Sequence, residues 1–172
     1  MKQKAINTSP QFYHTYIEKV NDLPLLEVLK HGGVDLFVSH LETLESIGNK
    51  IYAPNKWTIK EIIQHVIDTE RIFINRALRF VRMDNTNLPG YDHDAYVPVS
   101  RANDQSLINL IEEYKVLRQS SCHFFNKLNV EELLRKGTAN GNEMSVLAIG
   151  FILVGHPIHH FKVMEERYFN LI

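Results

Sequence analysis

The chain has 172 residues, a formal net charge of −1, and a composition that is 44% hydrophobic and 23% charged. These values are ordinary for a globular protein with a core of its own, and we expect one domain over residues 1–172, with residues 1–21 as an N-terminal extension. Lysine and arginine are spread along the chain and form no basic stripe, which argues against nucleic acid as a partner.

Nothing in the sequence predicts export or membrane insertion. The segment Met1–Pro10 has charge but no apolar stretch behind it, unlike a secretory signal. The apolar run Ile149–Val154 soon meets histidine and lysine, so we expect no run long enough to span a bilayer. The single cysteine, Cys122, cannot form an internal disulfide and is expected as a small core or boundary residue. We therefore predict a cytoplasmic protein.

The first predicted helix runs from about Asp22 to about Ile47. Apolar residues recur there at helical intervals, as they do along most of the chain, and no stretch alternates long enough to predict a sheet. A proline in the first turn is compatible with a helix start. The Gly32-Gly33 pair should kink or break this helix, because each glycine costs about 1 kcal/mol relative to alanine in a helix interior.

The second predicted helix has the clearest start. Thr58 and Glu61 have the spacing of a capping box, in which each side chain bonds the backbone N–H of the other residue. The apolar face then continues to about Met83. The following segment, 84–103, contains two prolines and is too long for an idle connection, so we expect it to lie over another part of the molecule.

The third predicted helix follows Asn103 or Asp104 and reaches about Leu128. Residues 129–134 could add a short helical piece, ended by Gly137.

The last predicted helix begins after Ser145 and ends near Tyr168. Asn140-Gly141, just before it, is typical of a turn. Four long helices predict an all-α fold, with a four-helix bundle as its natural architecture.

A five-residue stretch of this last helix, 156–160, contains three histidines. Residues four apart on a helix point within roughly 40° of each other, so His156 and His160 share a face, whereas His159 points about 100° away from His160. Two imidazoles rarely close a metal site, and His65 on the second helix is the best candidate for a third ligand, since bundles build metal sites from facing helices. Three neutral imidazoles plus water would suit zinc, nickel, iron or another borderline divalent metal and leave a position open for chemistry.

Two features limit this interpretation. No Glu-x-x-His occurs, which excludes a di-iron carboxylate bundle. Pro157 removes the helical bond to the Leu153 carbonyl, so the last helix should bend or restart there. The remaining histidines are expected to be core or surface residues: His14, His31, His40, His93 and His123.

The charged residues of the second helix carry weaker signals. Asp68 could orient a metal-binding imidazole by accepting a hydrogen bond from its other ring nitrogen. The more common role, which we expect for both Asp68 and Glu70, is that of a solvated helix charge. Arg76, Arg79 and Arg82 could bind an anionic substrate, with a solvated or loop-pairing role as the more common alternative.

Several segments together resemble the DinB superfamily, including its YfiT-like metal-dependent hydrolases. The resemblance extends from about Leu23 to Tyr168. Its most specific part is one histidine on the second helix combined with His-x-x-x-His on the last. The segments that carry it are 57–61, 64–70, 76–80, 88–92 and 155–160.

The resemblance implies a bundle with an up-down-down-up order and a long crossover, usually in a homodimer. It also implies a divalent metal, most often nickel or zinc, with iron or manganese as alternatives, on His65, His156 and His160. Relatives with a known activity are mostly thiol-dependent S-transferases or isomerases that use bacillithiol, mycothiol or glutathione.

We therefore expect a metal-dependent enzyme with a small-molecule substrate, of the low-molecular-weight thiol S-transferase or the hydrolase type. The metal would lower the pKa of a bound water or thiol. The general base is not assigned, and Asp68, Glu70, Tyr91 and Asp92 are the candidates. The alternative is a non-catalytic bundle, stress-related or ligand-binding, whose histidines are structural.

Overall fold

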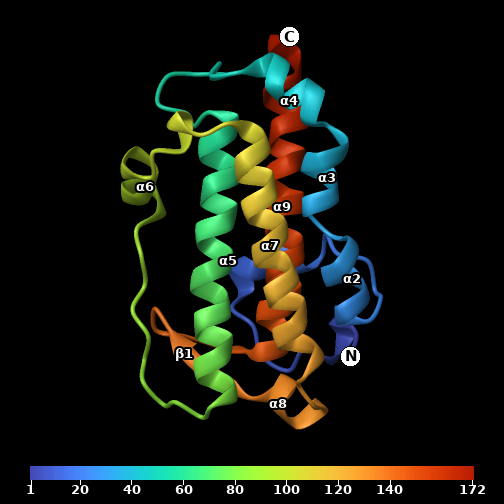
Figure 1. The fold of residues 1–172 in the computed structure, drawn as a ribbon. Helices are drawn as coiled ribbons and strands as arrows, with labels where there is room; N and C mark the ends of the chain where they lie inside the picture. The colour runs from blue at the N-terminus through green and yellow to red at the C-terminus, as the bar shows by residue number, and fades with distance from the viewer.

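The computed structural model describes residues 1–172, which form a four-helix bundle (Figure 1). In Figure 1 the chain runs up the first position of the bundle, down the second, down the third after a long crossover, and up the fourth. This confirms the predicted up-down-down-up bundle. Three short helices share the first position, and one long helix fills each of the others: α2 (Leu25–His31), α3 (Val34–Ser39), α4 (Leu41–Ile47), α5 (Ile59–Val81), α7 (Leu107–Asn126) and α9 (Val146–Arg167).

The first position is broken at Gly32-Gly33, as predicted, and also between α3 and α4, which the sequence did not predict. It begins at Leu25 and not at Asp22. Gly33 has a φ of +84°, a conformation that disfavours residues with a Cβ, and a Cβ there would lie 2.6 Å from Cγ of Pro157. The glycine pair therefore lets the chain turn while lying against α9.

Local caps set the starts of the long helices. Thr58 Oγ1 accepts from the N–H of Glu61 at 3.2 Å, and the N–H of Thr58 donates to the Glu61 carboxylate at 2.7 Å, which confirms the capping box of α5. Ser145 caps α9 as predicted, whereas α7 begins after Ser106, slightly later than predicted. The short helix α8 (Val130–Leu134) has a capping box of its own.

A small antiparallel hairpin corrects the expectation that the chain has no strand. It consists of β1 (Lys136–Ala139) and β2 (Asn142–Ser145), joined by the predicted turn at Asn140-Gly141, where φ is +51° and +71°. Gly137 does not end a helix. It lies within β1, where a Cβ would overlap an aromatic ring of α5.

Helix α9 forms the centre of the core. Each residue from Val146 to Pro157 is buried. The segment Val146–Leu171 is long and apolar enough to cross a membrane by length and composition, contrary to the sequence expectation, but 72% of its apolar window is buried inside the bundle. Its hydropathy is therefore that of a core helix.

Pro157 neither ends nor restarts α9. The Leu153 carbonyl, which loses its helical donor to the proline, accepts a hydrogen bond of 2.7 Å from Nη2 of Arg118. The same guanidinium donates from Nη1 to the carbonyls of Leu29 (3.4 Å) and Gly32 (2.7 Å) at the end of α2. One arginine of α7 thus satisfies carbonyls at both helix irregularities.

Glu70 was expected to be a solvated charge, and this is wrong. Its side chain is 2% exposed and pairs with Arg118 at 2.7 Å. Ser121 also donates to Glu70 at 2.7 Å, and the hydroxyl of Tyr114 accepts from the guanidinium at 2.8 Å. The carboxylate is buried because its partner lies on the facing helix α7, which charge patterning along α5 cannot reveal.

The remaining short elements lie outside the four bundle positions. Helix α1 packs on α9, and the crossover runs alongside α5 (Figure 1). The N-terminal elements are η1 (Gln3–Ala5), η2 (Gln11–Tyr13) and α1 (His14–Ile17); the crossover holds α6 (His93–Tyr96), η3 (Val97–Val99) and η4 (Ala102–Asp104); η5 (Phe169–Leu171) ends the chain.

Candidate metal centre and its cavity

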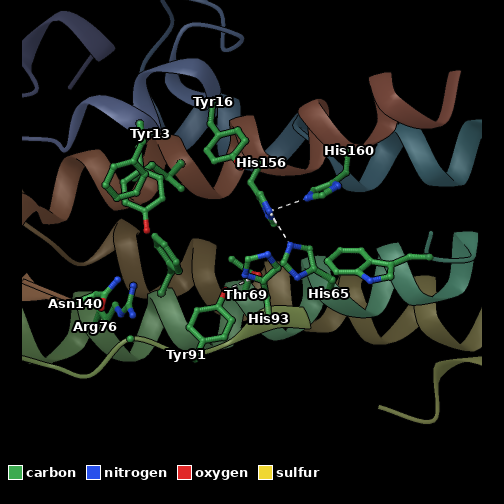
Figure 2. A pocket seen from close by; sticks show the side chains of 15 residues that line it. Tyr13, Tyr16, His65, Thr69, Arg76, Tyr91, His93, Asn140, His156 and His160 are labelled. Carbon is green, nitrogen blue, oxygen red and sulfur yellow. Dashed lines mark hydrogen bonds between the residues drawn. The ribbon is translucent and has the colours of Figure 1, made fainter. Parts of the chain in front are cut away.

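The structure brings His65 of α5 together with His156 and His160 of α9 (Figure 2). Nε2 of His156 lies 3.1 Å from Nε2 of His65 and 3.0 Å from Nε2 of His160. One ring nitrogen from each histidine lies within 4.8 Å of those of the other two. Three imidazoles from two helices therefore converge on one point.

Local structure explains which histidines meet. His65 lies about two turns after the Thr58 cap of α5. His156 and His160 are one turn apart on α9. His159 is outside the group and packs against Tyr16 at a ring-centroid distance of 5.2 Å, as its position around the helix predicts.

Burial keeps the three imidazoles neutral. Desolvation lowers the pKa of His65 to about 4 and that of His160 to about 3, and it lowers the pKa of His156 well below its usual range. The neighbouring imidazoles add to each shift, since a positive charge on one ring disfavours a charge on the next. At neutral pH each ring therefore has one nitrogen lone pair available.

Hydrogen bonding alone does not satisfy this arrangement. A neutral imidazole nitrogen either donates one proton or accepts with one lone pair, so Nε2 of His156 cannot bond well to both neighbouring Nε2 atoms. A tetrahedral zinc ion with bonds of 2.0–2.1 Å would separate its nitrogen ligands by about 3.3 Å. The two separations from Nε2 of His156, 3.1 and 3.0 Å, are within about 0.3 Å of this value, and the neutral donor set fits a borderline divalent cation.

A cavity of about 380 Å³ adjoins the three histidines, which form part of its wall. Tyr13 and Tyr16 of the N-terminal segment line it, and Tyr91 and His93 line it from the crossover. The long segment 84–103 was expected to lie over another part of the molecule, and it covers this cavity. The volume is in the range of small-molecule sites.

The candidates for a general base lie in different surroundings. Tyr91 lines the cavity, and its hydroxyl lies 2.9 Å from Oγ1 of Thr69. Asp68 accepts from Gln64 at 2.9 Å and has no contact with His65 among its hydrogen bonds and ion pairs. Asp92 caps α6 with its carboxylate. Glu70 is occupied by Arg118, so of the four candidates only Tyr91 borders the cavity.

The three arginines considered as anion ligands, Arg76 and Arg79 of α5 and its C-cap Arg82, have different surroundings. Arg79 pairs with Asp84 of the crossover at 2.6 Å, the predicted loop-pairing role, and Arg82 is exposed. Arg76 is 4% exposed and lines the cavity.

Sequence reasoning missed several lining residues. His93, expected to be an ordinary core or surface histidine, lies with its ring centroid 5.5 Å from that of His65 and 6.0 Å from that of Trp57. Asn140 of the hairpin turn and the two tyrosines of the N-terminal segment were not considered. The length of the crossover was the one sequence feature that indicated a covering role. It could not predict which crossover residues would face the cavity.

The fold and the site define a helical bundle with a three-histidine cluster beside a small-molecule cavity. The family model of the DinB superfamily matches residues 34–164, and the chain belongs to that superfamily.

A solved structure with the same fold is YfiT from Bacillus subtilis, described as a probable metal-dependent hydrolase with an unusual four-helix bundle topology. It is 14% identical, aligns over 96% of this chain and 91% of its own, and has a TM-score of 0.70. Among curated proteins, none matches the chain significantly.

Proposed function

We propose that this protein is a metal-dependent enzyme that acts on a small molecule, with a divalent cation held by Nε2 of His65, His156 and His160. The observation that carries the proposal is the convergence of the three Nε2 atoms, with His156 at 3.1 and 3.0 Å from the other two. Zinc or nickel is the metal we propose, because neutral imidazoles suit borderline cations.

The cavity beside the histidine cluster favours a catalytic metal site over a structural one. Structural zinc sites have four protein ligands, whereas catalytic sites keep a position open for water or substrate. Only three protein ligands meet here, and all three line the cavity. When bound, a divalent cation lowers the pKa of a water or thiol and polarises an electrophilic group of the substrate.

The residues around the cluster have defined tasks in this proposal. Tyr16 packs edge-on against His156, with ring centroids 5.3 Å apart, and fixes the imidazole on the cavity side. Burial raises the pKa of Tyr16 and of Tyr91, so both hydroxyls keep their proton at neutral pH. The hydroxyl of Tyr91 can thus donate to a group in the cavity while Thr69 orients it.

Two reactions fit this site. In hydrolysis, a deprotonated water attacks the substrate, and the description of YfiT as a probable hydrolase supports this version. In S-transfer, a low-molecular-weight thiol attacks as its thiolate, as the superfamily resemblance implies. Hydrolysis would turn over substrate without any added thiol, whereas S-transfer would require one. The homodimer and the cytoplasmic location stay predictions of the resemblance and the composition.

The test is metal analysis of the purified protein after loading with Zn²⁺ or Ni²⁺ and removal of excess metal. We expect one ion per chain in the natural protein and in His159→Ala, the matched control on the same helix. The His65→Ala, His156→Ala and His160→Ala variants should each lose most of it, because two imidazoles bind weakly. Full stoichiometric metal in His65→Ala and His156→Ala would remove the basis of the proposal.

The non-catalytic alternative predicts different results. Its histidines would be structural, so the purified protein would take up no stoichiometric metal, and addition of EDTA would leave its melting unchanged.

A further inference from the structure

Arg76 lies on the same face of α5 as His65. The two residues are eleven positions apart, which is three helical turns to within about 20°. At 1.5 Å per residue, Arg76 is roughly 16 Å further along the helix axis. Both side chains line the one cavity, with Thr69 and Phe73 between them on α5 (Figure 2). The cavity therefore has the histidine cluster toward one end and a guanidinium toward the other.

The charge of Arg76 is buried without a counter-ion. Its residue is 4% exposed, and no carboxylate lies within ion-pair distance of it, whereas the equally buried Arg118 is paired with Glu70. Nη2 donates to the Pro89 carbonyl at 3.1 Å, and the guanidinium lies 5.0 and 5.9 Å from the ring centroids of Phe73 and Tyr91. The hydroxyl of Tyr13 is also a hydrogen-bonding neighbour of the guanidinium, but it is not a counter-ion, because burial raises its pKa and it keeps its proton. A guanidinium cannot lose its proton in a protein, and a buried charge without a partner is unfavourable.

The free donors of Arg76 border open space. Every fully buried side-chain nitrogen and oxygen in the protein has a hydrogen-bond partner. The nitrogens of Arg76 that donate to no group of the chain are therefore accessible, and Arg76 lines the cavity.

The hairpin turn completes this end of the cavity. Asn140, whose side-chain amide bonds to no group of the chain, lies beside Arg76 in Figure 2. A Cβ at Gly90 would lie 2.6 Å from Oδ1 of Asn140, so glycine allows the crossover to pack against the turn. Two segments far apart in the sequence thus enclose the guanidinium.

The cavity wall contains no aspartate or glutamate. An arginine at one end, with no acidic group anywhere along the wall, gives a positive potential that attracts anions and repels cations.

We propose that Arg76, with Asn140 beside it, is an anion subsite, and that the enzyme takes a ligand with a carboxylate several bonds away from its reacting group. The carboxylate belongs to the substrate or to a thiol cosubstrate. The inference rests on the proposed function for the identity of the reacting end, while the anion subsite itself is a property of the protein without metal.

Trp57 provides the readout for a binding test. It is the one tryptophan of the chain and it lines the cavity, so its fluorescence reports occupancy with or without metal. The zinc-loaded protein is titrated with mercaptohexanoate and with mercaptohexanol, which share a thiol and differ in the carboxylate. The EDTA-treated protein is titrated with hexanoate and with hexanol.

We expect the carboxylate ligand of each pair to bind at least about tenfold more tightly than its alcohol, the usual size of a hydrogen bond to a charged group. The Arg76→Gln variant should lose this preference while binding the alcohols as before. Arg76→Lys should keep part of it, and Arg82→Gln, an exposed arginine of the same helix end, should keep all of it.

Two outcomes overturn the subsite: equal binding of acid and alcohol by the natural protein, or an undiminished preference in folded Arg76→Gln. Failure of the proposed function is distinct, since the protein would then hold no zinc while the hexanoate preference and its loss in Arg76→Gln persist. A preference of similar size in both pairs shows that the subsite acts without metal, and a preference confined to the thiol pair would contradict this.

Discussion

His156 has two imidazole nitrogens within hydrogen-bond distance of its own Nε2 and can satisfy only one of them. Such an arrangement is costly in a protein without metal, because the rings are also withdrawn from water and kept neutral. The cost depends on pH, since the unfolded chain takes up protons that the folded cluster resists.

We predict that the EDTA-treated protein loses stability as the pH falls from 7.5 to 5. The pKa of His65 is lowered from 6.5 to about 4 and that of His160 to about 3. Below about pH 6.5 the unfolded state binds more protons than the folded state, so the free energy of unfolding decreases toward acid. Urea unfolding at both pH values measures this.

The His65→Gln variant should show a weaker pH dependence of this free energy, because it removes one of the shifted groups. The control is His123→Gln, at an exposed position of α7. A pH dependence that is the same in His65→Gln as in the natural protein would contradict the assignment.

At the level of single residues, sequence spacing predicted the histidine pair of α9 and excluded His159. It identified His65 only as a candidate, because the two helices that meet are 91 residues apart and their relative rotation is a tertiary property. The same limit explains why His93 was missed and why Arg76 could not be told apart from Arg79.

Among the helices, Arg118 joins four segments. It pairs with Glu70 of α5 and donates to carbonyls of α2, of the glycine break and of α9. Two of these carbonyls lie at the end of α2, and the third is freed by Pro157. The irregular helices are thus tolerated because one buried side chain supplies the missing donors.

Replacement of Arg118 by methionine should lower the free energy of unfolding by roughly 3–5 kcal/mol, because it leaves the Glu70 carboxylate buried without its partner. The comparison is Arg101→Met, which removes an exposed pair with Asp104 and should change stability by no more than about 1 kcal/mol. Urea denaturation of both variants measures the difference. Equal effects of the two changes would show that the buried network does not support the helices.

The starts of α5 and α9 could be predicted from the sequence because their caps are local. Thr58 and Glu61 lie within one turn of each other, and Ser145 caps the residues that directly follow it. The hairpin could not be predicted, since each of its strands has four residues and shows no useful alternation. The burial of Glu70 depends on a partner 48 residues away.

For the whole molecule, the proposed metal would connect α5 to α9, the second and fourth positions of the bundle. Binding to ligands that are together only in the folded state stabilises that state by mass action. At a free metal concentration of about 1,000 times Kd the gain is about 4 kcal/mol.

Removal of metal with EDTA should therefore lower Tm by roughly 8–16 °C, because a domain of this size shifts by about 2–4 °C for each kcal/mol. The His159→Ala variant should show the same shift, and His65→Ala should show almost none. Differential scanning calorimetry with and without EDTA measures this, and an identical Tm in the natural protein under both conditions would contradict the linkage.

The most direct test is a crystal structure of the zinc-loaded protein, with anomalous diffraction measured on both sides of the zinc edge. We expect one strong anomalous peak between α5 and α9, about 2.0–2.1 Å from Nε2 of His65, His156 and His160. The absence of a peak at that position, with the three rings turned away from one another, would contradict the proposed site.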